Sequence, residues 1–172
     1  MDMKQHLLTI GFLMISILSV AQSNAEKAAV MEPIHQLFKG MRLGDSSIVH
    51  AAFTETVSMT TIAVDKDGKP VIKHESSLEG FLKTVGTPHS EIWSEVIWDT
   101  KILIDGHMAQ AWAPYAFYVG KNFSHCGVDA LQLFRDGEGV WKIFHLANTR
   151  QKIVGSRIGA NKACSSIVTD CF

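Results

Sequence analysis

The chain has 172 residues, which is enough for one ordinary domain and a removable N-terminal segment. Its 16 basic and 17 acidic residues give a net charge of -1. No stretch gathers lysine and arginine into a patch, so the composition argues against nucleic-acid binding.

Residues 1–25 have the pattern of a signal peptide. An uncharged apolar run, Leu7–Val20, is shorter than the ~20 residues that a membrane-spanning helix needs. Two small-x-small exits follow it and predict that the mature protein begins at Gln22 or Glu26. We therefore expect an exported protein, periplasmic or secreted, with no stable membrane anchor after cleavage. N-terminal sequencing of the mature protein would test this.

Two helices are predicted next. The first, within residues 26–45, places its apolar residues on one face. A second, short helix is predicted over residues 46–53, with Asp45 or Ser46 as its cap. The apolar residues of the first helix are Val30, Ile34, Leu37, Phe38 and Met41.

A hairpin and a third helix follow. Strands are expected over residues 55–64 and 71–75, separated by a turn rich in Asp, Gly and Pro. Ser76 and Glu79 form a capping-box pattern that opens a helix, and Gly86 ends it.

The second half of the chain predicts a meander of four antiparallel strands. Aromatic and β-branched residues fill segments 91–104, 107–119, 123–135 and 140–149, and Gly-bearing turns separate them. Helices followed by such a meander indicate an α+β domain with the helices on one face of the sheet. Residues 153–172 show no periodicity and are predicted to be an irregular tail.

The order of elements resembles the nuclear transport factor 2-like superfamily, and within it the SnoaL-like and lumazine-binding-like families. The resemblance extends from Val30 to about Arg150, and its local marks are segments 43–53, 104–112 and 136–145. It implies a curved mixed sheet that forms a cone with three helices, over a domain of residues 26–152. It also implies an apolar pocket and a homodimer formed through the outer face of the sheet.

Some members of this superfamily are acid–base enzymes. Isomerase-like members carry a carboxylate in the first strand, and cyclase-like members carry one near the end of the last strand. The matching segments here, Val57–Thr61 and Leu146–Thr149, contain no Asp or Glu. These departures favour ligand binding over chemistry of those types.

One group of polar residues could still support catalysis. His125 and Asp129 alternate along the third meander strand, so they share a face and are expected to act as a pair. Tyr115 would complete this candidate catalytic set. No metal-ligand spacing is found in the sequence, and no cofactor is expected.

Large aromatic residues of the meander predict a ligand pocket. Pro114 cannot donate to a strand ladder and is expected to mark a bulge that turns later side chains to the same side. Ordinary core packing is the alternative for this set. The predicted ligand-binding residues are Trp98, Trp112, Tyr115, Phe117, His125, Trp141 and His145.

The three cysteines allow one internal disulfide. Cys164 with Cys171 is the local pairing, and Cys126 with either of them is the alternative. Three unpaired thiols are a further alternative.

The sequence leaves three functions open. The first is an exported domain that binds a small, mostly planar or apolar molecule. The second is an isomerase, dehydratase or hydrolase that uses His125 and Asp129. The third is an interaction module that dimerises through its sheet.

Overall fold

The computed structural model describes residues 24–74 and 77–151. Most of the predicted signal peptide, the predicted tail, and both Cys164 and Cys171 lie outside the described residues. Within the described ranges, no helix is both long and apolar enough to cross a membrane.

Three helices precede most of the sheet. Residues 24–43 form the first helix, which continues through Pro33. The second and third are α2 (Ser46–Ala51) and α3 (Leu78–Gly86). Of the two predicted caps, Asp45 is the one that caps α2, by accepting hydrogen bonds from the backbone N–H groups of Ser47 and Ile48.

The described part of the chain contains one seven-stranded mixed sheet in the order β2-β1-β7-β6-β5-β3, with β4 also paired to β5. The pairing of β1 with β7 is parallel, and the other pairs are antiparallel. The strands are β1 (Phe53–Val64), β2 (Pro70–His74), β3 (Trp93–Ile97), β4 (Lys101–Asp105), β5 (Met108–Val119), β6 (Asn122–Arg135) and β7 (Trp141–Thr149).

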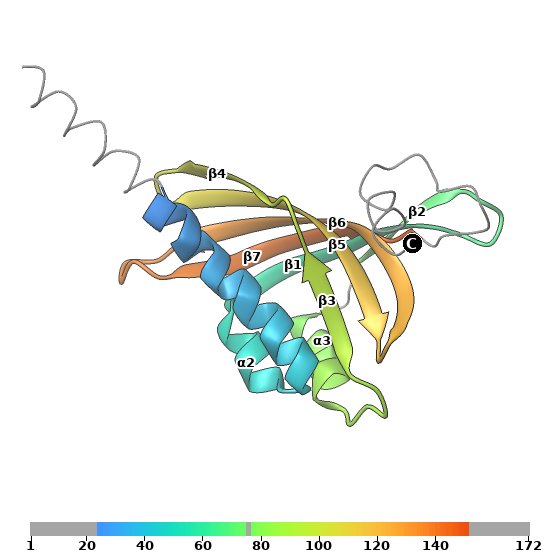
Figure 1. The fold of residues 1–172 in the computed structure, drawn as a ribbon. Helices are drawn as coiled ribbons and strands as arrows, with labels where there is room; N and C mark the ends of the chain where they lie inside the picture. The colour runs from blue at the N-terminus through green and yellow to red at the C-terminus, as the bar shows by residue number, and fades with distance from the viewer. Residues whose placement is uncertain (1–23, 75–76, 152–172) are drawn as a thin grey trace, which may run out of the picture.

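The sheet is strongly curved, and the helices lie against its concave side (Figure 1). Alternate residues of β5 and β6 therefore point toward the helices, among them Ala109, Ala111, Leu131 and Leu133. They pack with the apolar face of the first helix to form the core. This arrangement confirms the predicted α+β class with a curved mixed sheet and three helices.

The first strand of the meander differs from the prediction. It divides into β3 and β4, because the chain turns at Asp99, whose φ angle is +46°. Both pieces pair with the same strand, β5. The division gives the two halves different positions along the curved sheet.

The bulge expected at Pro114 does not form, because the ladder between β5 and β6 runs without interruption past this residue. The irregularity lies later, where Ser124 is the extra residue between the partners of Phe117 and Tyr118. A second irregularity leaves Phe144 as an extra residue in β7, between the pairs made by Ile143 and His145. These two bulges decide which later side chains face inward.

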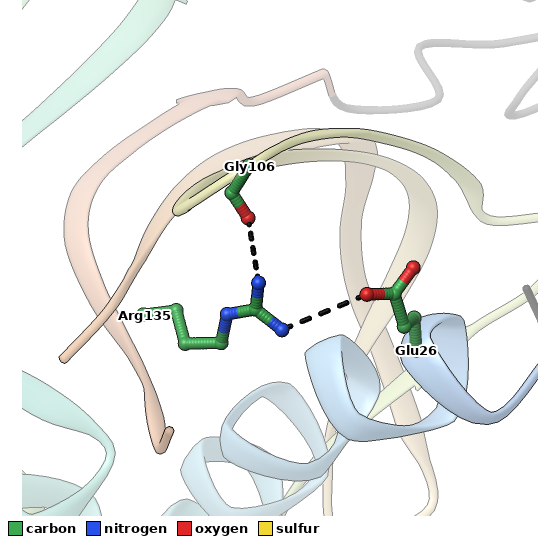
Figure 2. Close-up of polar contacts among 3 residues, drawn as sticks. All are labelled: Glu26, Gly106 and Arg135. Carbon is green, nitrogen blue, oxygen red and sulfur yellow. Dashed lines mark hydrogen bonds and ion pairs between the residues drawn. The ribbon is translucent and has the colours of Figure 1, made fainter. Parts of the chain in front are cut away.

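An arginine joins the first helix to the sheet at the end of β6. The guanidinium of Arg135 lies 3.6 Å from the carboxylate of Glu26 and donates to the carbonyl oxygen of Gly106 at 3.1 Å (Figure 2). It also lies over the ring of Trp141, 5.3 Å from the ring centre. These contacts connect the start of the first helix to the turn between β4 and β5 and to Trp141.

Candidate functional site

A cavity of about 1360 Å³ lies between the helices and the concave side of the sheet. The helices contribute mainly apolar groups to its wall, from Leu37, Phe38, Met41 and Phe81. The charged groups come from the strands and the chain segments that follow them. The cavity is larger than most pockets for small ligands, which hold ~300–1,000 Å³.

Two carboxyl groups meet in the wall of this cavity. Trp93, Glu95 and Ile97 alternate along β3 and place Glu95 on the inner side. Asp129 is an inward-facing residue of β6 and is only 3% exposed. The side chains of Glu95 and Asp129 are hydrogen-bonded to each other, so one of them must carry a proton.

The surroundings of this carboxyl pair favour protonation. Burial raises the pKa of Asp129 to about 6, although the hydrogen bond with Glu95 and the charge of Arg150 both lower it. Burial, followed by the charge of Asp129, raises the pKa of Glu95 well above its usual range. Part of the Glu95 surface is accessible because it faces the cavity, yet protein atoms surround its carboxyl group. Both shifts favour the protonated forms, so the pair shares a proton at pH values where exposed carboxyl groups have lost theirs.

Tyr115 lies beside the carboxyl pair, and its hydroxyl group already makes two hydrogen bonds within the protein. The hydroxyl donates to the carbonyl oxygen of Thr149 at 2.8 Å. It accepts a hydrogen bond from the guanidinium of Arg150. Burial, and then the charges of Asp129 and Glu95, raise the pKa of Tyr115, so the phenol stays neutral.

Asn148 adds a further polar atom to the same wall. It lies opposite Asp129 on one side and opposite Thr61 on the other, so the three residues form a row across β6, β7 and β1. Its side-chain oxygen is buried and has no hydrogen-bond partner among the described residues. Because a buried polar atom without a partner is costly, this oxygen is a candidate ligand contact.

Aromatic rings cover the wall next to the carboxyl pair. Trp93 and Phe117 make an edge contact with ring centres 6.0 Å apart, and Phe117 lies 5.0 Å from the ring of His125. His125 also makes an edge contact with Tyr115 at 5.7 Å. All four of these rings line the cavity.

Four of the residues predicted from the sequence therefore lie in the cavity wall: Tyr115, Phe117, His125 and Asp129. They do not form the predicted His125–Asp129 pair. The two residues are four positions apart on one strand, which separates their Cα atoms by about 13 Å. The His125 ring instead lies 3.0 Å from the Ser124 hydroxyl, and Asp129 is paired with Glu95.

The other predicted ligand-binding residues do not line this cavity. Trp112 points to the outer face of the sheet and is 48% exposed. Trp141 is packed in the core, and Trp98 lies beyond the end of β3. His145 was expected on the inner face together with Trp141, but the bulge at Phe144 reverses the alternation, so Leu146 and Asn148 point inward instead.

Sequence reasoning missed Glu95, Asn148, Arg150 and Trp93. Glu95 did leave a signal, because a charged residue two positions from Trp93 and two from Ile97 shares their face of a strand. Its partner in β6 could not be read from the pattern, since the two strands pair on opposite sides of β5.

Cys126 is completely buried on β6, and its backbone pairs with Gln151. The predicted disulfide involves residues outside the described ranges and stays a prediction. Within the described ranges, no group of three or more His, Cys, Asp or Glu residues is arranged to hold a metal ion.

Comparison with known proteins identifies the fold. No protein-family model and no curated protein matches the sequence significantly. Among solved structures, an NTF2-like protein of unknown function from Shewanella baltica has a TM-score of 0.55 at 21% identity, over 74% of this chain and 95% of its own.

Two further structural neighbours are described as enzymes. A candidate ketosteroid isomerase from Shewanella frigidimarina has a TM-score of 0.52 at 16% identity, over 70% of this chain and 94% of its own. A candidate dehydratase of the NTF2-like family from Streptomyces avermitilis has a TM-score of 0.57 at 14% identity, over 76% of this chain and 99% of its own. The chain therefore has the nuclear transport factor 2-like fold, also described as cystatin-like.

Proposed function

We propose that this protein binds a small, mostly apolar or planar molecule inside the cavity. The observation that carries the proposal is the carboxyl pair of Glu95 and Asp129, placed in a large cavity whose other walls are aromatic and aliphatic. An apolar pocket with a few converging polar groups of perturbed pKa is the usual form of a ligand site. The polar groups would orient the ligand, and the apolar walls would supply most of the binding energy.

A pair of phenylalanines tests where binding occurs. Phe117 lines the cavity, whereas Phe134 is 46% exposed on the outer face. With the neutral dye Nile red as the probe, we expect saturable fluorescence enhancement at one dye per chain. Phe117→Ala should weaken binding by about 1–3 kcal/mol, the value for losing a large buried apolar side chain, and Phe134→Ala should leave it unchanged. Equal losses in both variants would show that the dye binds elsewhere.

Acid–base catalysis on the bound molecule is a second candidate. It is favoured by the shared proton, because one carboxyl can donate a proton while the other accepts one. Two structural neighbours are described as a candidate isomerase and a candidate dehydratase. The candidate pair is now Glu95 with Asp129, in place of His125 with Asp129.

Deuterium exchange tests this second candidate without a known substrate. In deuterated buffer, the protein should speed exchange of the hydrogens next to the carbonyl group of cyclic ketones, followed by proton NMR. Glu95→Gln should slow that exchange by about 10²–10⁴ if the pair transfers the proton. Exchange at the same rate in Glu95→Gln and in the wild type would remove the catalytic candidate.

We further propose that the protein is exported and forms a homodimer through the outer face of the sheet. Leu103, Trp112 and Phe134 are 70%, 48% and 46% exposed and point to that face from β4, β5 and β6. Exposed apolar groups on neighbouring strands are typical of an interaction surface. Sedimentation at the mass of a monomer would contradict the dimer.

A further inference from the structure

We propose that the molecule bound in the cavity is an organic cation, with a primary or secondary ammonium group held at the carboxyl pair and an apolar or aromatic body against the helices. This inference rests on the proposed function, because it names the chemical class of the ligand. It follows from the kinds of polar atom that the cavity wall offers.

The wall is rich in hydrogen-bond acceptors. Glu95 and Asp129 present carboxyl oxygens, and Asn148, next to Asp129 in the sheet, presents a buried side-chain oxygen with no partner among the described residues. An alkylammonium group has up to three N–H donors and no acceptor. It could therefore bond all three side chains at once.

The Tyr115 hydroxyl, a hydrogen-bond donor next to the carboxyl pair, already donates its proton within the protein. The Tyr115 hydroxyl would be the natural donor to a ligand carbonyl, but its proton is held by the Thr149 carbonyl oxygen at 2.8 Å. The guanidinium of Arg150 donates to the oxygen of the same hydroxyl. A ligand carbonyl therefore finds no free proton on Tyr115.

The aromatic walls also suit a cation. Trp93 and Phe117 lie in edge contact beside the carboxyl pair, and Tyr115 completes this side. The faces of such rings attract organic cations, most strongly where water is excluded. On the opposite side, Phe38 and Phe81 offer apolar contact to the rest of the ligand.

Binding of an ammonium group should displace the shared proton. The charged or titratable groups that line the cavity are Glu95 from β3, Tyr115 from β5, Asp129 and His125 from β6, Arg150 after β7, and Asp65 and Lys73 at the hairpin. The lining residues of the helices carry none.

With one shared proton, the carboxyl pair and Arg150 sum to zero charge, and they sum to -1 once the proton leaves. The cation restores neutrality, and the proton passes to solvent. Affinity should therefore rise with pH while the free protein still holds the proton, by up to about tenfold per pH unit.

Isothermal titration of the mature protein with two matched probes tests the inference. Tryptamine and tryptophol share an indole ring and a two-carbon arm, and differ in carrying an ammonium or a hydroxyl group. At about pH 8 we expect tryptamine to bind roughly tenfold or more tightly than tryptophol. The advantage should shrink toward about pH 5, and titration in buffers of different ionisation enthalpy should show proton release.

Variants separate the carboxyl pair from general surface charge. Glu95→Gln should reduce the preference for tryptamine over tryptophol about tenfold, in proportion to a lost charge-assisted hydrogen bond. Glu55→Gln is the control, because Glu55 is exposed and does not line the cavity; it should change neither probe.

The outcomes distinguish the two levels of the proposal. Tryptophol binding as tightly as tryptamine would overturn the cation and leave cavity binding intact. If Nile red binds and tryptamine does not, the cation is likewise overturned and cavity binding stands. Failure of all three probes to bind would remove the proposed function itself.

Discussion

Replacing Gly127 with alanine should destabilise the fold by about 3 kcal/mol or more, as expected when a side chain is forced into occupied space. Gly127 lies between His125 and Asp129 on the inner side of β6. A Cβ atom here would overlap the carbonyl oxygen of Thr149, and would lie 2.8 Å from its carbonyl carbon and 2.9 Å from its side-chain oxygen. Because these atoms are mostly backbone, they cannot move aside without breaking the hydrogen bond from Tyr115.

Urea unfolding measures this effect, and Gly137→Ala is the matched control. Gly137 lies in the turn after β6, and no atom of the described residues would come within 4 Å of a Cβ atom added there. Its replacement should change the free energy of unfolding by no more than about 0.5 kcal/mol. If Gly127→Ala were as stable as Gly137→Ala, β6 could not approach Thr149 this closely, and the cavity wall would have a different shape.

The second large effect concerns the pH dependence of stability. The folded pKa of Asp129 is raised to about 6, so the folded protein binds more protons than the unfolded chain between about pH 4 and that value. The free energy of unfolding contributed by this group should therefore fall as the pH rises through that window. Above about pH 6, Asp129 is ionised in both the folded and the unfolded protein. Its burial as a charged group then lowers the free energy of unfolding by about 2–3 kcal/mol, and this is the penalty of the ionised carboxyl group.

Asp129→Asn should remove this penalty. An amide has the same shape, stays neutral and can donate a hydrogen bond to the Glu95 carboxylate. We expect the variant to be more stable than the wild type by about 2–3 kcal/mol at pH 8, and to lose the advantage near pH 4. Urea unfolding at a series of pH values measures both.

Asp67→Asn serves as the control, because Asp67 is exposed in the turn between β1 and β2, and it should leave the pH dependence unchanged. An Asp129→Asn variant that is less stable than the wild type across the whole pH range would show that the carboxyl pair stabilises the fold. If Asp129→Asn is more stable than the wild type, Asp129 lowers the stability of the fold, as functional groups often do.

The elements that the sequence predicted best are those with local signals. Asp45 caps α2, and Ser77 caps α3, one residue later than the predicted capping box that begins at Ser76. Both side chains reach backbone groups only two or three residues away. The Gly106 turn between β4 and β5 has the positive φ angle that short hairpins need. Each of these features depends on a few neighbouring residues.

The site was predicted less well because its geometry depends on irregularities. Alternation put His125 and Asp129 on one face, and both line the cavity, since β6 pairs regularly with β5 from His125 to Gln132. It placed His145 inward wrongly, because one extra residue, Phe144, reverses the facing of all later side chains in β7. No residue near Phe144 in the sequence indicates a bulge. Pro114 is of a type that favours bulges, yet no bulge forms there.

The carboxyl pair is a long-range feature. Glu95 and Asp129 come from strands that flank β5 on opposite sides, yet their side chains are hydrogen-bonded to each other. The sheet that carries them is strongly curved (Figure 1). The sequence pattern gives the inner face of each strand but not the depth of the curve. A pair of this kind therefore becomes visible only once the strands are placed in space.

The shared proton underlies both the ligand site and the preference for a cation, and NMR titration of the side-chain carboxyl carbons tests it most directly. We expect Asp129 to titrate near its pKa of about 6, and Glu95 to titrate above the usual carboxyl range. In Glu95→Gln only Asp129 should titrate, and its pKa should stay raised, because the group remains buried and the amide still donates a hydrogen bond to its ionised form. Titration of both groups at about 4, as in exposed carboxyl groups, would contradict the shared proton.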